Sequence, residues 1–197
     1  MQMLLSSGSP RRKELLSLLG IPFQVKVPNI PEVQRINETP RSFCLRISRE
    51  KAVKVAQLNP HALVIGADTI VVIDGKILGK PRDTREANDF LMLLQDRVHA
   101  VFTGYTIILG NHHISKVVRT KVRFRAMTPE EISWYVLTGE PMDKAGAYAV
   151  QGIGSLFIEK VHGCYTNVIG LPLSYLYNDL KKFGILLHSG SGGGFDS

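Results

Sequence analysis

The chain has 197 residues, 44% of them hydrophobic, which is enough to bury one sizeable core. Its 24 lysines and arginines outnumber its 17 aspartates and glutamates, and this formal charge of +7 favours anionic partners such as nucleotides, nucleic acid or acidic surfaces. Two cysteines are too few for a secreted disulfide framework, and no run of about eighteen apolar residues suggests a membrane segment. We therefore expect a soluble cytoplasmic protein with one domain at 1–187 and a flexible Ser/Gly-rich tail at 188–197.

Helix caps and hydrophobic runs divide the chain into alternating strands and helices. A strand ends at residues 4–5, and Ser9 and Pro10 are suited to begin the helix that follows. The later predicted elements are a helix at 40–58, a strand at 63–73, a hairpin strand at 76–78, a helix opened by Asp83, strands at 101–109 and 114–124, a helix opened by Thr128, and a helix at 172–183. Because hairpins require antiparallel pairs, the pattern predicts an α/β fold with a mixed twisted sheet flanked by helices.

Two arginines stand where a helix disfavours them. Arg11 and Arg12 lie in the first turn of the first predicted helix, whose dipole is unfavourable for cations. Free backbone amides at this helix end, together with the hydroxyls of Ser7 and Ser9, would complete a phosphate-binding cradle. The local pattern is equally compatible with a capped helix that carries two solvated arginines.

Three further charged residues can each be interpreted either as part of a functional site or as an ordinary structural feature. Lys51 falls near the centre of an apolar helix face, where its ammonium needs an anionic partner unless it extends past the apolar rim. Asp68 interrupts an apolar strand, so we expect it to meet a metal, a cation or a catalytic water, the alternative being a strand-end carboxylate that accepts N–H groups. Lys80 follows the hairpin and is, by itself, ordinary loop chemistry.

Six separate motifs resemble those of the Maf family and occur in the family's order. They are SGSPRRKELL at 7–16, GADT at 66–69, LGKP at 78–81, DKAGAY at 143–148, VQG at 150–152 and NVIGLPL at 167–173. The resemblance implies a nucleoside triphosphate pyrophosphatase that uses a divalent metal, Mg²⁺ or Mn²⁺. It also implies a fold like that of the inosine triphosphate pyrophosphatases, with two lobes around a cleft, and it is compatible with a homodimer.

The same resemblance implies roles for the unusual residues. Asp68 would be the proton acceptor, and Glu32 would join it at the metal, beside Pro31, where many members carry a second acid. The residues that would bind the phosphates are Ser7, Arg11, Arg12, Lys51 and Lys80. Arg11, Thr69 and Gln151 resemble the branch that prefers dTTP and UTP, so these are the implied substrates, with CTP and modified pyrimidine nucleotides as further candidates.

A second hypothesis is a non-catalytic protein that senses nucleotides or binds nucleic acid in the control of cell division. A basic row would serve it, formed by Arg119, Lys121, Arg123 and Arg125. Aromatic residues do not interleave with this row as stacking platforms, and a solvated strand face accounts for the pattern. We therefore do not expect nucleic acid to be a partner.

Overall fold

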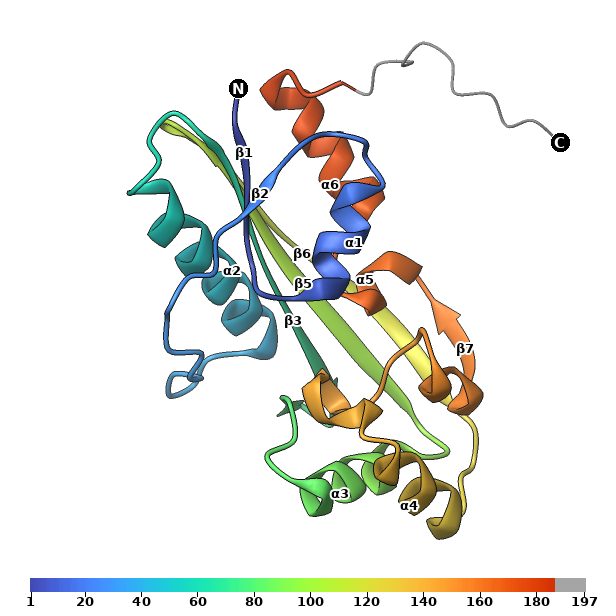
Figure 1. Cartoon of the computed structure of the whole chain (residues 1–197). Coiled ribbons are helices and arrows are strands. Elements are labelled where there is room, and N and C mark those ends of the chain that lie inside the picture. Colours follow the sequence, from blue (N-terminus) through green and yellow to red (C-terminus); the bar gives the residue numbers. More distant parts are fainter. Residues whose placement is uncertain (187–197) are drawn as a thin grey trace, which may run out of the picture.

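A computed structural model describes residues 1–186 and is built around one mixed sheet (Figure 1). The strands are β1 (Met3–Ser6), β2 (Gln24–Val25), β3 (Leu63–Ile73), β4 (Lys76–Leu78), β5 (Val98–Leu109), β6 (His112–Phe124) and β7 (Ile158–His162). The helices are α1 (Pro10–Ser17), α2 (Pro40–Ala56), α3 (Thr84–Leu94), α4 (Pro129–Leu137), α5 (Tyr165–Ile169) and α6 (Leu173–Leu180). The predicted domain end at residue 187 and the predicted tail at 188–197 lie outside the described residues.

The strand order is β2-β1-β3-β5-β6-β7, with β4 paired to β3 as well. β1 runs parallel to both β2 and β3, whereas every other pair is antiparallel, which confirms the predicted mixed sheet. β1 pairs only with the first part of β3 and stops where Ser6 faces Gly66, while β4 pairs with the last part of β3, from Val71. No strand in the described part of the chain therefore pairs with this edge of β3 over residues 67–70.

Helices cover both faces of the sheet. Successive β3 side chains point to opposite faces: Val64 packs in a cluster with α2 residues, and Ile65 packs in a cluster with residues of α1 and α6. Figure 1 shows α2 on one side of the long strands and α1 and α6 on the other. Two glycines allow α2 to pack closely on the sheet, because a Cβ at Gly66 or Gly104 would collide with the α2 backbone.

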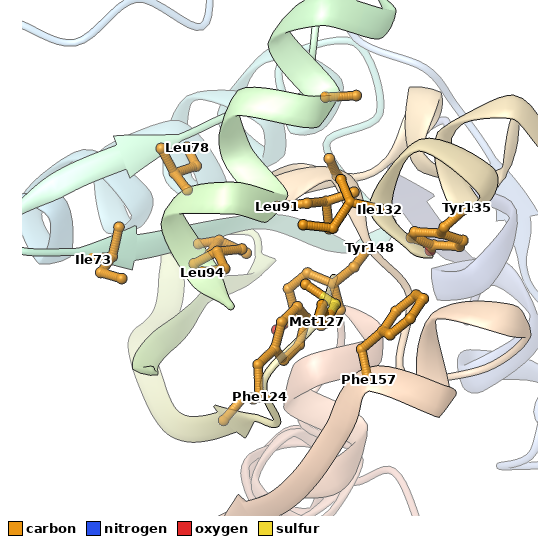
Figure 2. Close-up of a cluster of buried hydrophobic side chains, with 14 of the residues drawn as sticks. Ile73, Leu78, Leu91, Leu94, Phe124, Met127, Ile132, Tyr135, Tyr148 and Phe157 are labelled. Atoms are coloured by element: carbon orange, nitrogen blue, oxygen red, sulfur yellow. The ribbon is translucent and has the colours of Figure 1, made fainter. Parts of the chain in front are cut away.

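A further cluster of buried side chains closes the end of the sheet where α3 and α4 pack together (Figure 2). Leu91 and Leu94 of α3 meet Ile132 and Tyr135 of α4 there, and Phe157 lies beside Tyr135. The short 3₁₀ segments after α4 pack against this cluster. Among the described helices, none is both long enough and apolar enough to cross a membrane.

Most predicted elements are confirmed, and the differences have local causes. The strand predicted at 114–124 begins two residues earlier, at His112, because Leu109 pairs with His112 across a turn in which Gly110 adopts a φ of 55°. α2 ends at Ala56, two residues before the predicted end. Three short elements were not predicted, namely β2 with two residues and β7 and α5 with five residues each.

Candidate active site

A cavity of about 870 Å³ lies at the unpaired edge of β3. Its walls come from the β1–α1 loop, the segment after β2, α2, β3, the turn after β4, and the loops around residues 143–151 and 168–170. All residues that the sequence predicted for the site line this cavity, namely Ser7, Arg11, Arg12, Glu32, Lys51, Asp68, Thr69, Lys80 and Gln151. The gap between β1 and β4 therefore brings together residues from distant parts of the chain.

Lys51 and Asp68 form a buried ion pair at the base of the cavity. The side chain of Asp68 points to the α2 face of the sheet, and Lys51 Nζ lies 2.8 Å from its Oδ1. The same Nζ lies 2.8 Å from Oε1 of the half-exposed Glu32. The expectations that Lys51 needs an anionic partner and that Asp68 meets a cation are both confirmed. Asp68 Oδ2 has no hydrogen-bond donor among the described residues, so it is available to a ligand or a water.

Cys44, next to Asp68, has a structural role. Cys44 lies on α2, where its Sγ accepts a hydrogen bond from the Gly104 amide at 3.0 Å and donates to the Asp68 carbonyl at 3.3 Å. Burial, and then the charge of Asp68, raise the pKa of the Cys44 thiol far above its ordinary value. A thiol that stays protonated is a poor nucleophile, so the chemistry of this cavity belongs to its carboxylates and cations.

Arg12 joins three segments in the cavity wall. Ser9 caps α1 as predicted, and the Arg12 guanidinium donates to Gly170 O at 2.9 Å, Ser7 Oγ at 3.0 Å and Thr69 Oγ1 at 2.9 Å. Burial lowers the pKa of Arg12, whereas the charge of Asp68 raises it, and a guanidinium remains a cation in either case. These bonds use three of its five N–H donors, and the other two have no partner among residues 1–186 and can meet a ligand.

Arg11 also lines the cavity and is more exposed than Arg12. Its Nη1 is 3.1 Å from Asp143 Oδ2, and Lys144 Nζ is 2.6 Å from Asp143 Oδ1. Lys80 is exposed and has no hydrogen-bond or ion-pair partner among residues 1–186, so its ammonium is free to bind an anion. Asp143 and Lys144 line the cavity without having been predicted as site residues, although both belong to the motif DKAGAY.

The two remaining predicted residues differ in how they are held. Thr69 is part of the wall, with its Oγ1 3.0 Å from Thr103 Oγ1 and 3.3 Å from Gly170 O. Gln151 is exposed at the cavity mouth and belongs to a loop. Its amide is therefore available to a ligand and can both donate and accept hydrogen bonds.

The carboxylates of Glu32 and Asp68 are suited to bind a divalent metal when a bound ligand supplies the remaining oxygen atoms. Within residues 1–186, no group of three His, Cys, Asp or Glu side chains is arranged to hold a metal ion without further ligands. Glu32 and Asp68 nevertheless converge on one cationic atom, Lys51 Nζ. Mg²⁺ is commonly held by one or two carboxylates together with substrate phosphates and water, which matches this donor set.

Three of the four side chains in the basic row, which follows β6 and ends at Arg125 just after it, have contacts within the molecule. Arg123 pairs with Asp96, Arg125 pairs with Glu131, and Arg119 lies over the Phe102 ring. A face that bound nucleic acid through its charges would need them free to meet phosphates. These contacts leave fewer of the row's charges free, and the absence of a nucleic-acid partner stays a prediction.

The fold and the cavity together define a class of protein: an α/β protein with one cavity that is lined by cations and carboxylates and suits a ligand with several negative charges. The sequence profile of the Maf-like protein family matches residues 2–183, and the chain belongs to this family, as its motifs predicted. It is 49% identical over 191 residues to the dTTP/UTP pyrophosphatase of Syntrophus aciditrophicus, covering 96% of this chain and 93% of that protein. It is 44% identical over 184 residues to the dTTP/UTP pyrophosphatase of Bacillus cereus strain AH820, covering 93% and 96%.

Proposed function

We propose that this chain hydrolyses dTTP and UTP to the nucleoside monophosphate and pyrophosphate, with CTP and modified pyrimidine nucleotides as further candidate substrates. The observation that carries the proposal is a buried carboxylate, Asp68, held by Lys51 at the base of a cavity whose rim carries further cations. The names of the relatives, dTTP/UTP pyrophosphatase, support the substrate class. A cavity of about 870 Å³ is of the size that encloses a nucleotide-sized ligand.

The triphosphate would be held by charge from several segments. Arg11 and the two free donors of Arg12 stand at the N-terminal end of α1, whose dipole also favours an anion. Lys80 approaches from the turn after β4, and Lys51 from α2. These cations lie on separate elements and all line the cavity. A chain of phosphates inside the cavity would therefore meet positive charge from several elements.

The reaction adds water across the bond between the α- and β-phosphates. Asp68 accepts a proton from the water while the water oxygen attacks the α-phosphorus. The bond from this phosphorus to the bridging oxygen breaks, and pyrophosphate leaves with the electron pair. Lys51 fixes Asp68 through Oδ1, which leaves Oδ2 for the water, and the surrounding cations stabilise the negative charge that develops on the leaving group.

Glu32 and Asp68 would hold Mg²⁺ or Mn²⁺ together with phosphate oxygens of the substrate. When bound, the metal supplies charge neutralisation for the leaving pyrophosphate. This role agrees with the convergence of both carboxylates on Lys51 Nζ. A homodimer and a cytoplasmic location stay predictions.

Pyrophosphate release from a panel of dTTP, UTP, CTP, dATP and dGTP, with Mg²⁺ or Mn²⁺, tests the proposal. We expect turnover of the pyrimidine nucleotides, and a loss of kcat in Asp68→Asn of about 10²- to 10⁴-fold, the usual contribution of a general base. Asp89→Asn, an exposed position on α3, is the matched control and should keep the wild-type rate. A folded Asp68→Asn variant at full rate, or salt-sensitive nucleic-acid binding without any turnover, would contradict the proposal.

A further inference from the structure

The loop that carries Gln151 has no regular secondary structure between residues 148 and 152. Gln151 itself is exposed, so packing against its side chain does not fix its position. An amide can distinguish one base from another only when its backbone is held in place, because small misplacement weakens directional hydrogen bonds. The loop must therefore be anchored by its neighbours.

Glu140 supplies this anchor from the first residue of a short 3₁₀ helix, η1 (Glu140–Asp143). Its Oε1 accepts hydrogen bonds from the Gly154 amide at 2.9 Å and from the Tyr135 hydroxyl at 2.8 Å. Its Oε2 accepts a hydrogen bond from the Ile153 amide at 2.9 Å. Burial opposes ionisation of Glu140, yet these donors together hold the pKa of its carboxyl below the usual value. One carboxylate thus binds the backbone two and three residues after Gln151.

Two glycines let the loop approach this carboxylate. Gly152 adopts a φ of 96°, and a Cβ at this position would lie 2.6 Å from Glu140 Oε2. A Cβ at Gly154 would lie 2.5 Å from the Tyr135 hydroxyl oxygen. Tyr135 is itself fixed, since its ring packs on Phe157 with 5.1 Å between centroids, in the cluster that Figure 2 shows. The anchor is therefore continuous with the hydrophobic core around α3 and α4.

We propose that Glu140 is a positioning residue for base recognition: it fixes the backbone that presents Gln151 to the base of the nucleotide. The inference rests on the proposed function for the identity of the ligand, and on the role in substrate preference that the family resemblance implies for Gln151. Glu140 does not line the cavity, so it acts through the loop and not by contact with the substrate. Its loss should therefore weaken contacts to the base and leave contacts to the phosphates unchanged.

Glu140→Gln is the first test, because it keeps the size of the side chain and removes one acceptor. The new amide NH₂ group would oppose either the Ile153 amide or the donors now bound to Oε1. We expect KM for dTTP to rise about five- to tenfold, as for the loss of about one hydrogen bond, and the preference for dTTP over dATP to fall by a similar factor. The inhibition constant of inorganic tripolyphosphate, which has no base, should not change.

Two further variants make the result specific. Tyr135→Phe keeps the packed ring and removes both a donor to Glu140 and the acceptor of the Ala149 amide, so it should shift KM in the same direction. Glu130→Gln, an exposed position on α4, should change neither constant. The proposal is overturned if Glu140→Gln raises KM for dTTP and the tripolyphosphate inhibition constant equally, or leaves both as in the wild type.

Amide hydrogen exchange gives a readout that does not depend on catalysis. In Glu140→Gln, the Ile153 and Gly154 amides should exchange faster than in the wild type and in Glu130→Gln. Unchanged exchange would overturn the anchoring role even if activity fell. If the wild-type protein hydrolyses no nucleotide, the proposed function and the specificity role fail together, while faster exchange would still show that Glu140 anchors the loop.

Discussion

Lys51 is only 7% exposed, and its contribution to the stability of the fold depends on its ion pair with Asp68. Lys51→Met keeps most of the packing but leaves Asp68 charged and buried without its partner. We expect this substitution to lower the free energy of unfolding at pH 7 by about 3 kcal/mol, as for other buried pairs that lose one member. Urea denaturation, monitored by circular dichroism, measures the loss.

A double-mutant cycle separates this pair from simple packing. Asp68→Asn combined with Lys51→Met removes both charges, so the double variant should be more stable than the sum of the two single losses predicts. Additive losses, or a loss below about 1 kcal/mol in Lys51→Met, would show that the pair is not coupled.

His99 connects pH with stability. Its Nε2 lies 2.7 Å from the Tyr148 hydroxyl oxygen, its Nδ1 is buried without a partner in the described structure, and burial lowers the pKa of His99 to about 3. An unfolded histidine has a pKa near 6.5, so between these values the unfolded chain binds one more proton than the folded chain. The contribution of His99 to stability is thus present above pH 6.5 and is lost on acidification, by about 1.4 kcal/mol per pH unit.

His99→Gln removes this titration and keeps a group that can bond to the Tyr148 hydroxyl. Urea unfolding at pH 7.5, 6 and 5 should show a smaller loss of stability on acidification in the variant than in the wild type. Parallel curves for the two proteins would contradict the assignment of the effect to His99.

At the residue scale, the sequence predicted those site residues whose charge conflicts with their local pattern. Lys51 in an apolar helix face and Asp68 in an apolar strand were conspicuous, and the structure pairs them. Lys144 and Glu140 gave no such signal, because a charged residue in a polar loop is ordinary. Their positions depend on contacts with residues distant from them along the chain or in other elements, which local patterns do not contain.

At the scale of elements, the approach of α2 to the sheet sets the geometry of the site. A Cβ on Gly104 would lie 2.5 Å from the Cys44 carbonyl oxygen, which belongs to the α2 backbone and cannot move alone. Gly104→Ala should therefore displace α2, lower the free energy of unfolding by about 3 kcal/mol, and reduce kcat by moving Lys51 away from Asp68. Thermal unfolding and pyrophosphate release measure the two effects.

Gly79→Ala is the control for stability, because a Cβ there would have no atom within 4 Å. Equal stability of the Gly104 and Gly79 variants would show that close approach of α2 is not required.

Helix starts were predictable at this scale, whereas short elements were not. Ser9, Asp83 and Thr128 all accept the capping hydrogen bonds that the sequence indicates, since a cap is a local interaction. β2 has two residues, and its pairing with β1 is a tertiary contact. Periodicity carries no information about so short a strand.

At the scale of the whole molecule, alternating strands and helices were enough to predict an α/β fold with a mixed sheet. The gap between β1 and β4 was not predictable, because it follows from which part of β3 each short strand pairs with. The likeness to inosine triphosphate pyrophosphatases and the single-domain boundary stay predictions. The gap has a consequence for stability, because a ligand in it would contact the β1–α1 loop, α1, α2, β3 and the segment after β4 together.

A nucleotide should therefore stabilise the whole fold, and its phosphates should account for most of the effect. Asp68→Asn is suited to the measurement because its kcat, lower by about 10²- to 10⁴-fold, slows the consumption of dTTP. At about a hundredfold excess over Kd, binding adds about 2.7 kcal/mol, which corresponds to a rise in Tm of about 5 to 10 °C for a chain of this size. Thymidine, which carries the base without phosphates, should give a much smaller shift at the same concentration. Equal shifts from thymidine and dTTP would mean that the cations around the gap do not bind the phosphates.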